Sequence, residues 1–167
     1  MDRRLIRALV LLVCFWLVPT LVSATTPQTE PPKFTKNAFL NGMEILFLPS
    51  TSDRSDFVLR VKNGAAFDPA GKWGVTHMMA RAMMARTERR AGDQIQQELA
   101  LMNAEIRVRV DWDAIFFEGS APQNRIADAL NVLAEIVTKP RFEEETLERI
   151  RADSLNKLAE AAGHAGK

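Results

Sequence analysis

The sequence predicts an α+β fold in which helices are layered on a mostly antiparallel sheet. Apolar and polar residues alternate at residues 57–61 and 106–112, as they do in a strand with one buried face. Apolar residues recur at helical spacing at residues 126–137 and again between residues 143 and 162. The predicted order is three strands, two helices, two strands and two helices, and this order indicates the fold class.

Turn residues and apolar runs mark the first elements. Asn41-Gly42 is a dipeptide typical of a hairpin turn, and the run at 43–48 is apolar enough for a strand covered on both faces. Residues 57–61 form the next strand, which Asn63-Gly64 ends. From residue 73 to about residue 86, a pattern rich in Met and Ala predicts the first helix.

The second half of the chain is divided by similar signals. A break at Ala91-Gly92-Asp93 supplies an N-cap for a short helix. The next strand meets its hairpin partner, residues 115–117, across Asp113-Ala114. Lys139-Pro140 ends the helix at 126–137, and acidic residues open the last helix, as the helix dipole favours. The residues expected to face the core are Ile95, Leu99, Met102, Ile106, Val108, Val110, Trp112, Ile126, Ala129, Leu130, Leu133, Ile136, Val137, Leu147, Ile150, Ser154 and Leu158.

The N-terminus predicts export. Three arginines precede an apolar run at residues 8–18, and Val22-Ser23-Ala24 offers small residues for a signal peptidase. We therefore expect a signal peptide at 1–24 with cleavage after Ala24, a flexible linker at 25–35, and a periplasmic or secreted domain. An uncleaved anchor is the alternative, although the run is short for a span of about 20 residues and Pro19 interrupts its end.

Composition excludes several classes of function. The single cysteine, Cys14, lies in the predicted signal peptide, so the mature chain has no disulfide, cysteine metal site or cysteine nucleophile. Of the 22 basic and 21 acidic residues, three arginines and Asp2 precede residue 25, which leaves a net charge of −1. This balance argues against nucleic acid or an anionic membrane surface as a partner, with membrane attachment expected only through an uncleaved signal.

The segment from Gly74 to Met84 is the candidate site for chemistry. His77 opens a helix just after a turn, a common geometry for metal ligation. A zinc peptidase helix of the inverted type needs two histidines at i and i+4 and a glutamate beside the second. The chain has no glycine-rich phosphate loop and no Gly-x-Ser-x-Gly elbow. The arginines at 86, 89 and 90, beside Glu88, are interpreted as an exposed loop.

Four segments in order resemble one family of enzymes. They are Leu40-Asn41-Gly42, the run VKNGAAFDP at 61–69, the run GKWGVTH at 71–77, and Pro140-Arg141-Phe142 before an acidic helix. Over residues 36 to 160 the chain is similar to the pitrilysin/insulinase family of zinc metallopeptidases, which includes the mitochondrial processing peptidase type. The resemblance implies a peptidase-like N-terminal domain at 36–167, truncated because a full domain would continue for tens of residues.

The resemblance also implies that the zinc motif is degenerate. The family's His-x-x-Glu-His falls on His77-Met78-Met79-Ala80-Arg81. Ala80 at the general-base position has no proton acceptor, and Arg81 at the second ligand position is a permanent cation. Lys157 falls at the third ligand position. We therefore expect no catalytic residue, no bound metal and no cofactor, although the family uses zinc. His77 is then a polar residue at a helix start.

Two interpretations of the substituted pocket stay open. With Arg81 and Lys157 close together, the pocket would be electropositive and attract a carboxylate, or it would be a solvated charged face. The chain is expected to be an inactive, peptide-holding partner of a homologous peptidase-like subunit in an exported assembly. The alternative is a free-standing binding or self-assembly module without a peptidase partner. An active metallopeptidase would require ligands that the sequence does not supply.

Overall fold

The computed structural model describes residues 33–91 and 93–165 of the 167-residue chain. The predicted signal peptide and most of the predicted linker lie outside these residues. The chain divides into two compact units, Met1–Pro49 and Ser50–Lys167, which are described separately. No helix in the described ranges is both long enough and apolar enough to span a membrane.

The first unit contains a β-hairpin. β1 (Thr35–Ala38) pairs antiparallel with β2 (Glu44–Phe47), and the turn between them lies at the predicted Asn41-Gly42, where Gly42 has φ 82°. The expectation that this apolar run is covered on both faces is wrong: Leu46 is 66% exposed and Phe47 is 59% exposed. The apolar run forms one strand of a two-stranded sheet, and no further element within the described part of this unit covers it.

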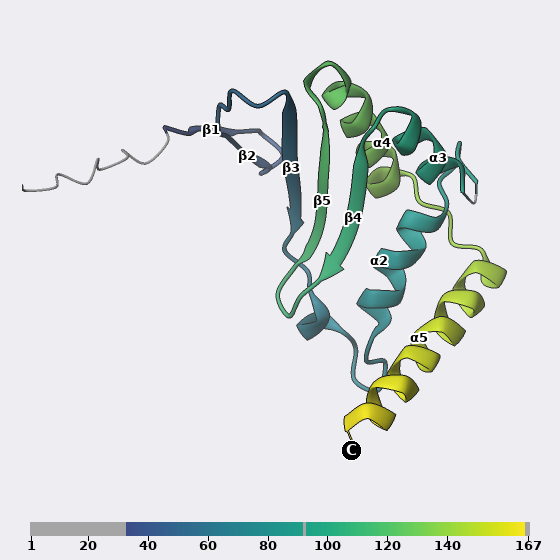
Figure 1. The fold of residues 1–167 in the computed structure, drawn as a ribbon. Coiled ribbons are helices and arrows are strands. Elements are labelled where there is room, and N and C mark those ends of the chain that lie inside the picture. The colour runs from purple at the N-terminus through teal and green to yellow at the C-terminus, as the bar shows by residue number, and fades with distance from the viewer. Residues whose placement is uncertain (1–32, 92, 166–167) are drawn as a thin grey trace, which may run out of the picture. The chain divides into compact units, whose positions relative to one another are not determined.

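The second unit combines a three-stranded sheet with helices (Figure 1). Its elements are β3 (Arg54–Val61), η1 (Ala65–Phe67), α2 (Val75–Ala85), α3 (Gln94–Leu101), β4 (Glu105–Val110), β5 (Ile115–Pro122), η2 (Gln123–Arg125), α4 (Ile126–Thr138) and α5 (Glu144–Ala165). With β1 and β2, this order confirms the predicted sequence of strands and helices. The predicted α+β class is confirmed as well.

The sheet has the order β3-β5-β4, and both of its pairings are antiparallel. Helices α2, α3 and α4 pack on one side of it (Figure 1). The five largest fully buried side chains fill the space between sheet and helices: Phe117, Ile95, Leu99, Ile136 and Val132. Helical spacing predicted Ile95, Leu99 and Ile136 of this set, whereas Phe117 and Val132 were not among the residues expected to face the core.

Several residues predicted to face the core are exposed instead. Trp112 is 71% exposed because β4 ends at Val110 and Trp112 lies in the turn before β5, which is closed by the Asp111 N–H donating to the Ala114 carbonyl at 2.8 Å. Leu158 is 67% exposed, although Ile150 on the same helix is only 5% exposed. The apolar spacing of α5 continues beyond the part of the helix that is buried against the rest of the second unit. Leu130 on α4 is also exposed.

Candidate functional site

The start of α2 is fixed by a buried carboxylate. Asp68 accepts hydrogen bonds from the Gly74 N–H at 2.6 Å, the Thr76 N–H at 3.0 Å and the Thr76 hydroxyl at 2.5 Å. Gly74 takes φ 91°, which favours glycine, and directly precedes the first helical residue. The hydrogen bond from the Thr76 hydroxyl is the main cause of the lowered pKa of Asp68. Asp68 thus satisfies orphan N–H groups of the helix that carries the degenerate motif.

His77 and Arg81 lie one turn apart on α2 and share a face of the helix. His77 is exposed to solvent, and Arg81 is half-buried. Ala80 has no exposed surface and belongs to the hydrophobic core. A side chain at the family's general-base position therefore borders the core of this unit.

Arg81 and Lys157 are brought together by a residue that the sequence did not single out. Asp153 on α5 accepts from the Arg81 guanidinium at 2.5 Å, and the Lys157 Nζ lies 3.1 Å from the same carboxylate oxygen. Arg81 also donates to the Ser154 hydroxyl at 2.9 Å. The hydrogen bonds from Arg81 and then Lys157 lower the pKa of Asp153. Asp153 precedes Lys157 by four residues, a spacing typical of helical ion pairs. This spacing is the feature of the sequence from which the Asp153–Lys157 pair could have been predicted.

The geometry around the two cations has features of both interpretations of the substituted pocket. A carboxylate is present beside the two cations, and it comes from the same chain. The cluster is nevertheless partly solvated, because the side chains of Arg81, Asp153 and Lys157 are 36%, 43% and 67% exposed. One excess positive charge remains among these three residues.

The residues at the positions where the resemblance puts the zinc ligands do not fit a zinc ion. A guanidinium and an ammonium offer no lone pair to a metal at neutral pH, and the intervening carboxylate is already shared by both cations. His77 alone supplies one ligand where a catalytic zinc needs three from the protein. Within the described ranges, no group of three or more histidine, cysteine, aspartate or glutamate side chains is placed to hold a metal ion.

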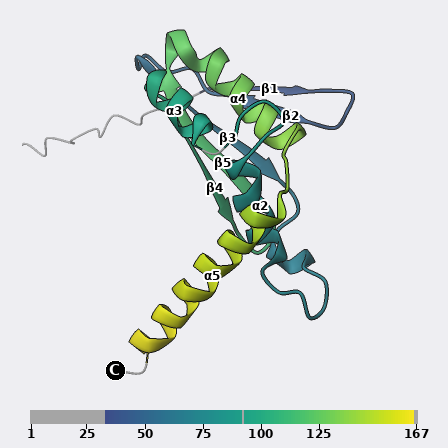
Figure 2. The same cartoon turned by 90° about the vertical axis from the view of Figure 1, so that its right-hand side faces the viewer.

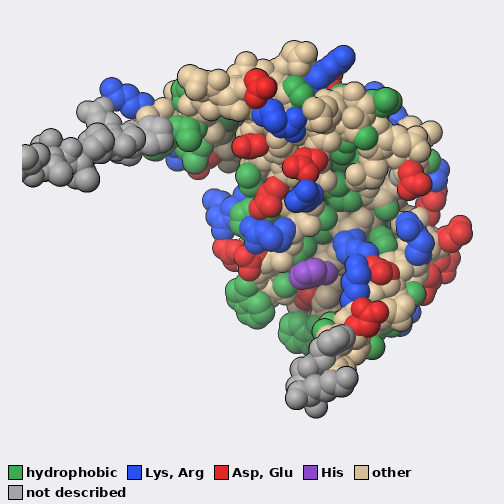
Figure 3. All heavy atoms as spheres, viewed as in Figure 1, with side chains coloured by type: hydrophobic (Ala, Val, Ile, Leu, Met, Phe, Trp, Pro, Cys, Tyr) green, Lys and Arg blue, Asp and Glu red, His purple; other side chains and the backbone are tan. Residues whose placement is uncertain are grey.

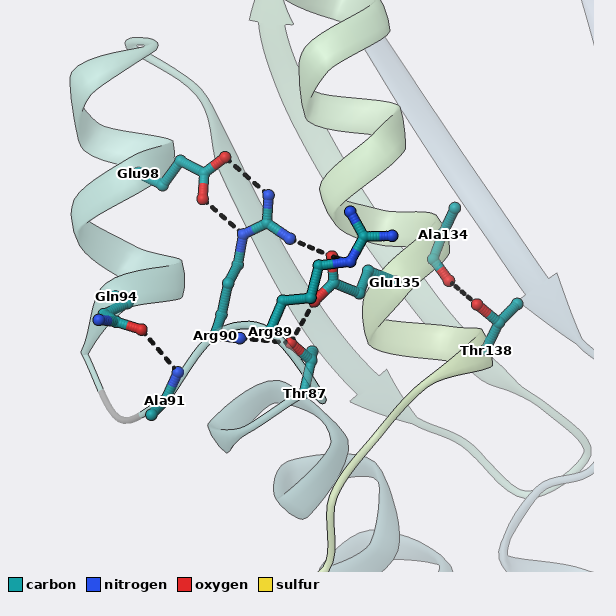
Figure 4. Close-up of polar contacts among 9 residues, drawn as sticks. All are labelled: Thr87, Arg89, Arg90, Ala91, Gln94, Glu98, Ala134, Glu135 and Thr138. Carbon is teal, nitrogen blue, oxygen red and sulfur yellow. Dashed lines mark hydrogen bonds and ion pairs between the residues drawn. The ribbon is translucent and has the colours of Figure 1, made fainter.

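A second polar cluster lies where the sequence indicated an exposed loop (Figure 4). The guanidinium of Arg90 is paired with both carboxylate oxygens of Glu98 and with Glu135, and its side chain is only 19% exposed. Glu135 is 7% exposed and also accepts from the Thr87 hydroxyl at 2.5 Å. The exposed-loop prediction is therefore wrong for Arg90, although Arg89 is 71% exposed.

The charges of this second cluster satisfy one another. Burial would raise the pKa of Glu135, but hydrogen bonds from Thr87 and Arg90 outweigh it, so the pKa is lowered. The pKa of Arg90 is raised, mainly by its hydrogen bonds to Glu98. All buried side-chain polar atoms of the described residues have a hydrogen-bond partner. This cluster joins the 86–90 loop to α3 and α4, and we assign it a structural role.

Comparison with known proteins identifies the family. A family model described as insulinase, peptidase family M16, matches residues 46–164. A crystal structure of a protease from Helicobacter pylori has the same fold, with a TM-score of 0.71 and 15% sequence identity. The match covers 76% of this chain and 31% of that chain, so this sequence spans less than a third of that protease.

The comparison with curated proteins found no match. The family model, by contrast, spans the whole of β3 to α4 and nearly all of α5. This range contains every residue of the degenerate motif, as well as Asp153 and Lys157. The chain belongs to the insulinase family of peptidases, peptidase family M16.

Proposed function

We propose that this chain is a catalytically inactive member of the insulinase family and serves as a non-catalytic, peptide-holding subunit of an exported peptidase-type assembly. One observation carries the proposal: Arg81 and Lys157, at two positions where the family resemblance puts zinc ligands, are both ion-paired with Asp153. The cluster joins α2 to α5 through the contacts of Arg81 with Asp153 and Ser154.

Inactivity follows from the chemistry of these positions. Hydrolysis by this family's mechanism requires a metal-bound water and a base that accepts its proton. Ala80 supplies no base, and the cations at positions 81 and 157 repel a dication. Reversing one substitution would not restore the site, because three functional groups have been lost.

A peptide-holding role is supported by the sheet. β3 and β4 form the two edges of the three-stranded sheet, and each pairs only with β5 among the described strands. An edge strand can pair with an extended peptide through main-chain hydrogen bonds, which make little demand on peptide sequence. Such a subunit would contribute binding surface while a homologous subunit with an intact His-x-x-Glu-His performs hydrolysis.

Zinc content provides the test of the inactive site. The purified protein is compared with an Arg81→His/Lys157→Glu variant, with elemental analysis after dialysis as the measurement. Ala80→Glu is added only in a second variant, because Ala80 has no exposed surface and a carboxylate there would border the core. An Arg125→His/Lys139→Glu variant is the matched control, since both of these residues are exposed and lie outside the cluster.

We expect no stoichiometric zinc in the parent protein or the control, and a gain of zinc in the ligand variant. One tightly bound zinc in the parent protein would overturn the assignment of the degenerate positions. If the ligand variant folds by circular dichroism yet gains no zinc, the alignment of Lys157 with the third ligand is wrong.

Export and partnership are tested separately. The intact mass of the protein recovered from its native host should correspond to a chain beginning at Thr25, and co-purification should recover a homologous chain with an intact motif. The alternative function, a free-standing self-associating module, is favoured by the exposed Leu155 and Leu158 on α5, which are 57% and 67% exposed. A dimer in sedimentation experiments with no homologous partner would support that alternative.

A further inference from the structure

Three large aromatic side chains protrude from neighbouring loops of the second unit. Phe67 in η1 is 64% exposed, Trp73 before α2 is 74% exposed, and Trp112 in the β4–β5 turn is 71% exposed. We call these three residues the aromatic tip. Figure 3 shows large hydrophobic side chains at the lower left of the view, over the β4–β5 turn and η1. Neither the degenerate motif nor the proposed peptide edge uses them.

The backbone holds two of these residues side by side. The N–H groups of Ala65 and Ala66 donate to the carbonyls of Asp111 and Trp112, each at 2.9 Å. Gly64 makes this approach possible, because a Cβ there would lie 2.3 Å from the Ala114 nitrogen. η1 is therefore fixed to the β4–β5 turn, and binding through Phe67 and Trp112 needs little ordering of the backbone that carries them.

The third ring stands on a loop that is also held in place. Figure 2 shows the loop between η1 and α2 projecting from the second unit. Its two ends are tied by Asp68, which binds the backbone N–H of Gly74 and of Thr76. Trp73 directly precedes Gly74 and points its large apolar surface into solvent. The backbone of the loops that carry the three exposed rings is thus held by hydrogen bonds.

The charges around the aromatic tip are uneven. Asp111 pairs with Arg109 at 3.0 Å, and Asp113 pairs with Arg60 at 2.5 Å, so the acidic residues of the turn are neutralised. Two exposed lysines at the tip have no ion-pair partner within the described part of the chain: Lys62, which follows β3, and Lys72, which precedes Trp73. Asp68 is buried and held by hydrogen bonds, and Glu118 shares Arg109 with Asp111. The two ammonium groups are therefore the exposed charges of the tip that no carboxylate of the described residues pairs.

We propose that the aromatic tip docks on the surface of an anionic lipid bilayer. Tryptophan is enriched at the headgroup level of membranes, and lysine keeps its ammonium at the interface while its stem lies along apolar groups. Tryptophan and phenylalanine are enriched in protein–protein interfaces as well, but lysine is depleted there, so Lys62 and Lys72 are the residues that favour lipid over a protein partner. The composition-based expectation of no anionic membrane partner considered only net charge, whereas binding depends on charge within a Debye length of the surface.

Tryptophan fluorescence gives a direct test. The chain has three tryptophans, and only Trp16 lies outside the tip. In the full chain carrying Trp16→Phe, the emission therefore reports on Trp73 and Trp112 alone. Vesicles of phosphatidylglycerol should shift this emission to shorter wavelength, and acyl-brominated lipid should quench it. Vesicles of phosphatidylcholine should have little effect, and added salt should weaken the response.

Matched variants separate the tip from the apolar N-terminus. Lys62→Gln/Lys72→Gln should weaken vesicle binding about 30-fold, at roughly 1 kcal/mol for each lysine. Phe67→Ser should also reduce the shift. The control Lys33→Gln/Lys139→Gln removes the same charge from exposed positions outside the tip and should bind as the parent does. Binding through the N-terminal segment would leave the tip tryptophans unshifted and would not respond to these variants.

Three outcomes would overturn the proposal. No shift on either vesicle excludes lipid docking by the aromatic tip. Equal shifts on phosphatidylglycerol and phosphatidylcholine exclude the lysine contribution. A shift that occurs only on addition of a purified protein partner makes the tip a protein interface. None of these outcomes bears on zinc binding, so the docking proposal fails or stands independently of the proposed function.

Discussion

Replacement of Glu135 by alanine should destabilise the protein far more than an equivalent change elsewhere on α4. The Glu135 side chain is 7% exposed and accepts a hydrogen bond from the Thr87 hydroxyl. Thr87 is only 2% exposed, so the substitution leaves a buried hydroxyl without its acceptor. A hydrogen bond to a charged group is worth about 1.5–3 kcal/mol, and breaking a buried pair costs about 3–5 kcal/mol. Because Arg90 still pairs with Glu98 in the variant, we expect a loss of folding stability at the lower end of this range, about 3 kcal/mol.

The matched control is Asp128→Ala. Asp128 lies on the same helix, pairs with Arg125 at 3.1 Å, and has a side chain that is 51% exposed. An exposed ion pair contributes less than about 1 kcal/mol to the free energy of unfolding. With an m-value of about 2 kcal/mol per M of urea, Glu135→Ala should lower the unfolding midpoint by about 1.5 M, measured by circular dichroism.

The pH dependence adds a second check. The pKa of Glu135 is lowered in the folded state, so its contribution is present above the unfolded pKa and is lost as the pH falls through the folded value. The difference in midpoint between parent and Glu135→Ala should therefore shrink in acid. The reasoning is refuted if Glu135→Ala and Asp128→Ala cost the same at pH 7, or if the Glu135→Ala difference grows as the pH falls below about 4.

Two further substitutions test how the site is positioned. Gly64→Ala should destabilise by several kcal/mol in urea unfolding, because the new Cβ would lie 2.3 Å from the Ala114 nitrogen, whereas Gly163→Ala meets nothing within 4 Å and should be neutral or slightly stabilising. Equal effects would contradict the close packing of η1 on the β4–β5 turn. Asp68→Asn should lower the melting temperature at pH 7 and have a smaller effect at pH 3, because the lowered pKa of Asp68 means that its contribution is lost as the pH falls through the folded value. A constant difference across this range would show that the charge of Asp68 does not stabilise the start of α2.

The local chemistry of the site residues can be predicted from the sequence, because it depends on residue type at a given position. Ala80 has no proton acceptor and Arg81 has no lone pair for a metal wherever they lie in the fold. Their placement on one helix follows from spacing alone. The assignment of Lys157 came from the family resemblance, and the structure places it in one ion-pair cluster with Arg81.

Side-chain contacts between different helices and strands could not be predicted in the same way. Periodicity shows which residues share a face, but it does not show which residues lie opposite that face. The sequence therefore did not single out Asp153 on α5 or Glu135 on α4. Burial of Arg90 depends on acceptors from both α3 and α4, 8 and 45 residues away in the sequence.

The sequence by itself determined the order of strands and helices, the α+β class and the resemblance to the insulinase family, because these follow from local patterns and motifs. Only the tertiary structure decided which predicted core residues are buried, since Trp112 and Leu158 match their patterns yet lie beyond the packed parts of their elements. It also decided that Arg81 and Lys157 share a carboxylate and that η1, which carries Phe67, lies against the β4–β5 turn, which carries Trp112. Charges and apolar groups act through distance in space, and distance between remote segments is set by the packing of the whole domain.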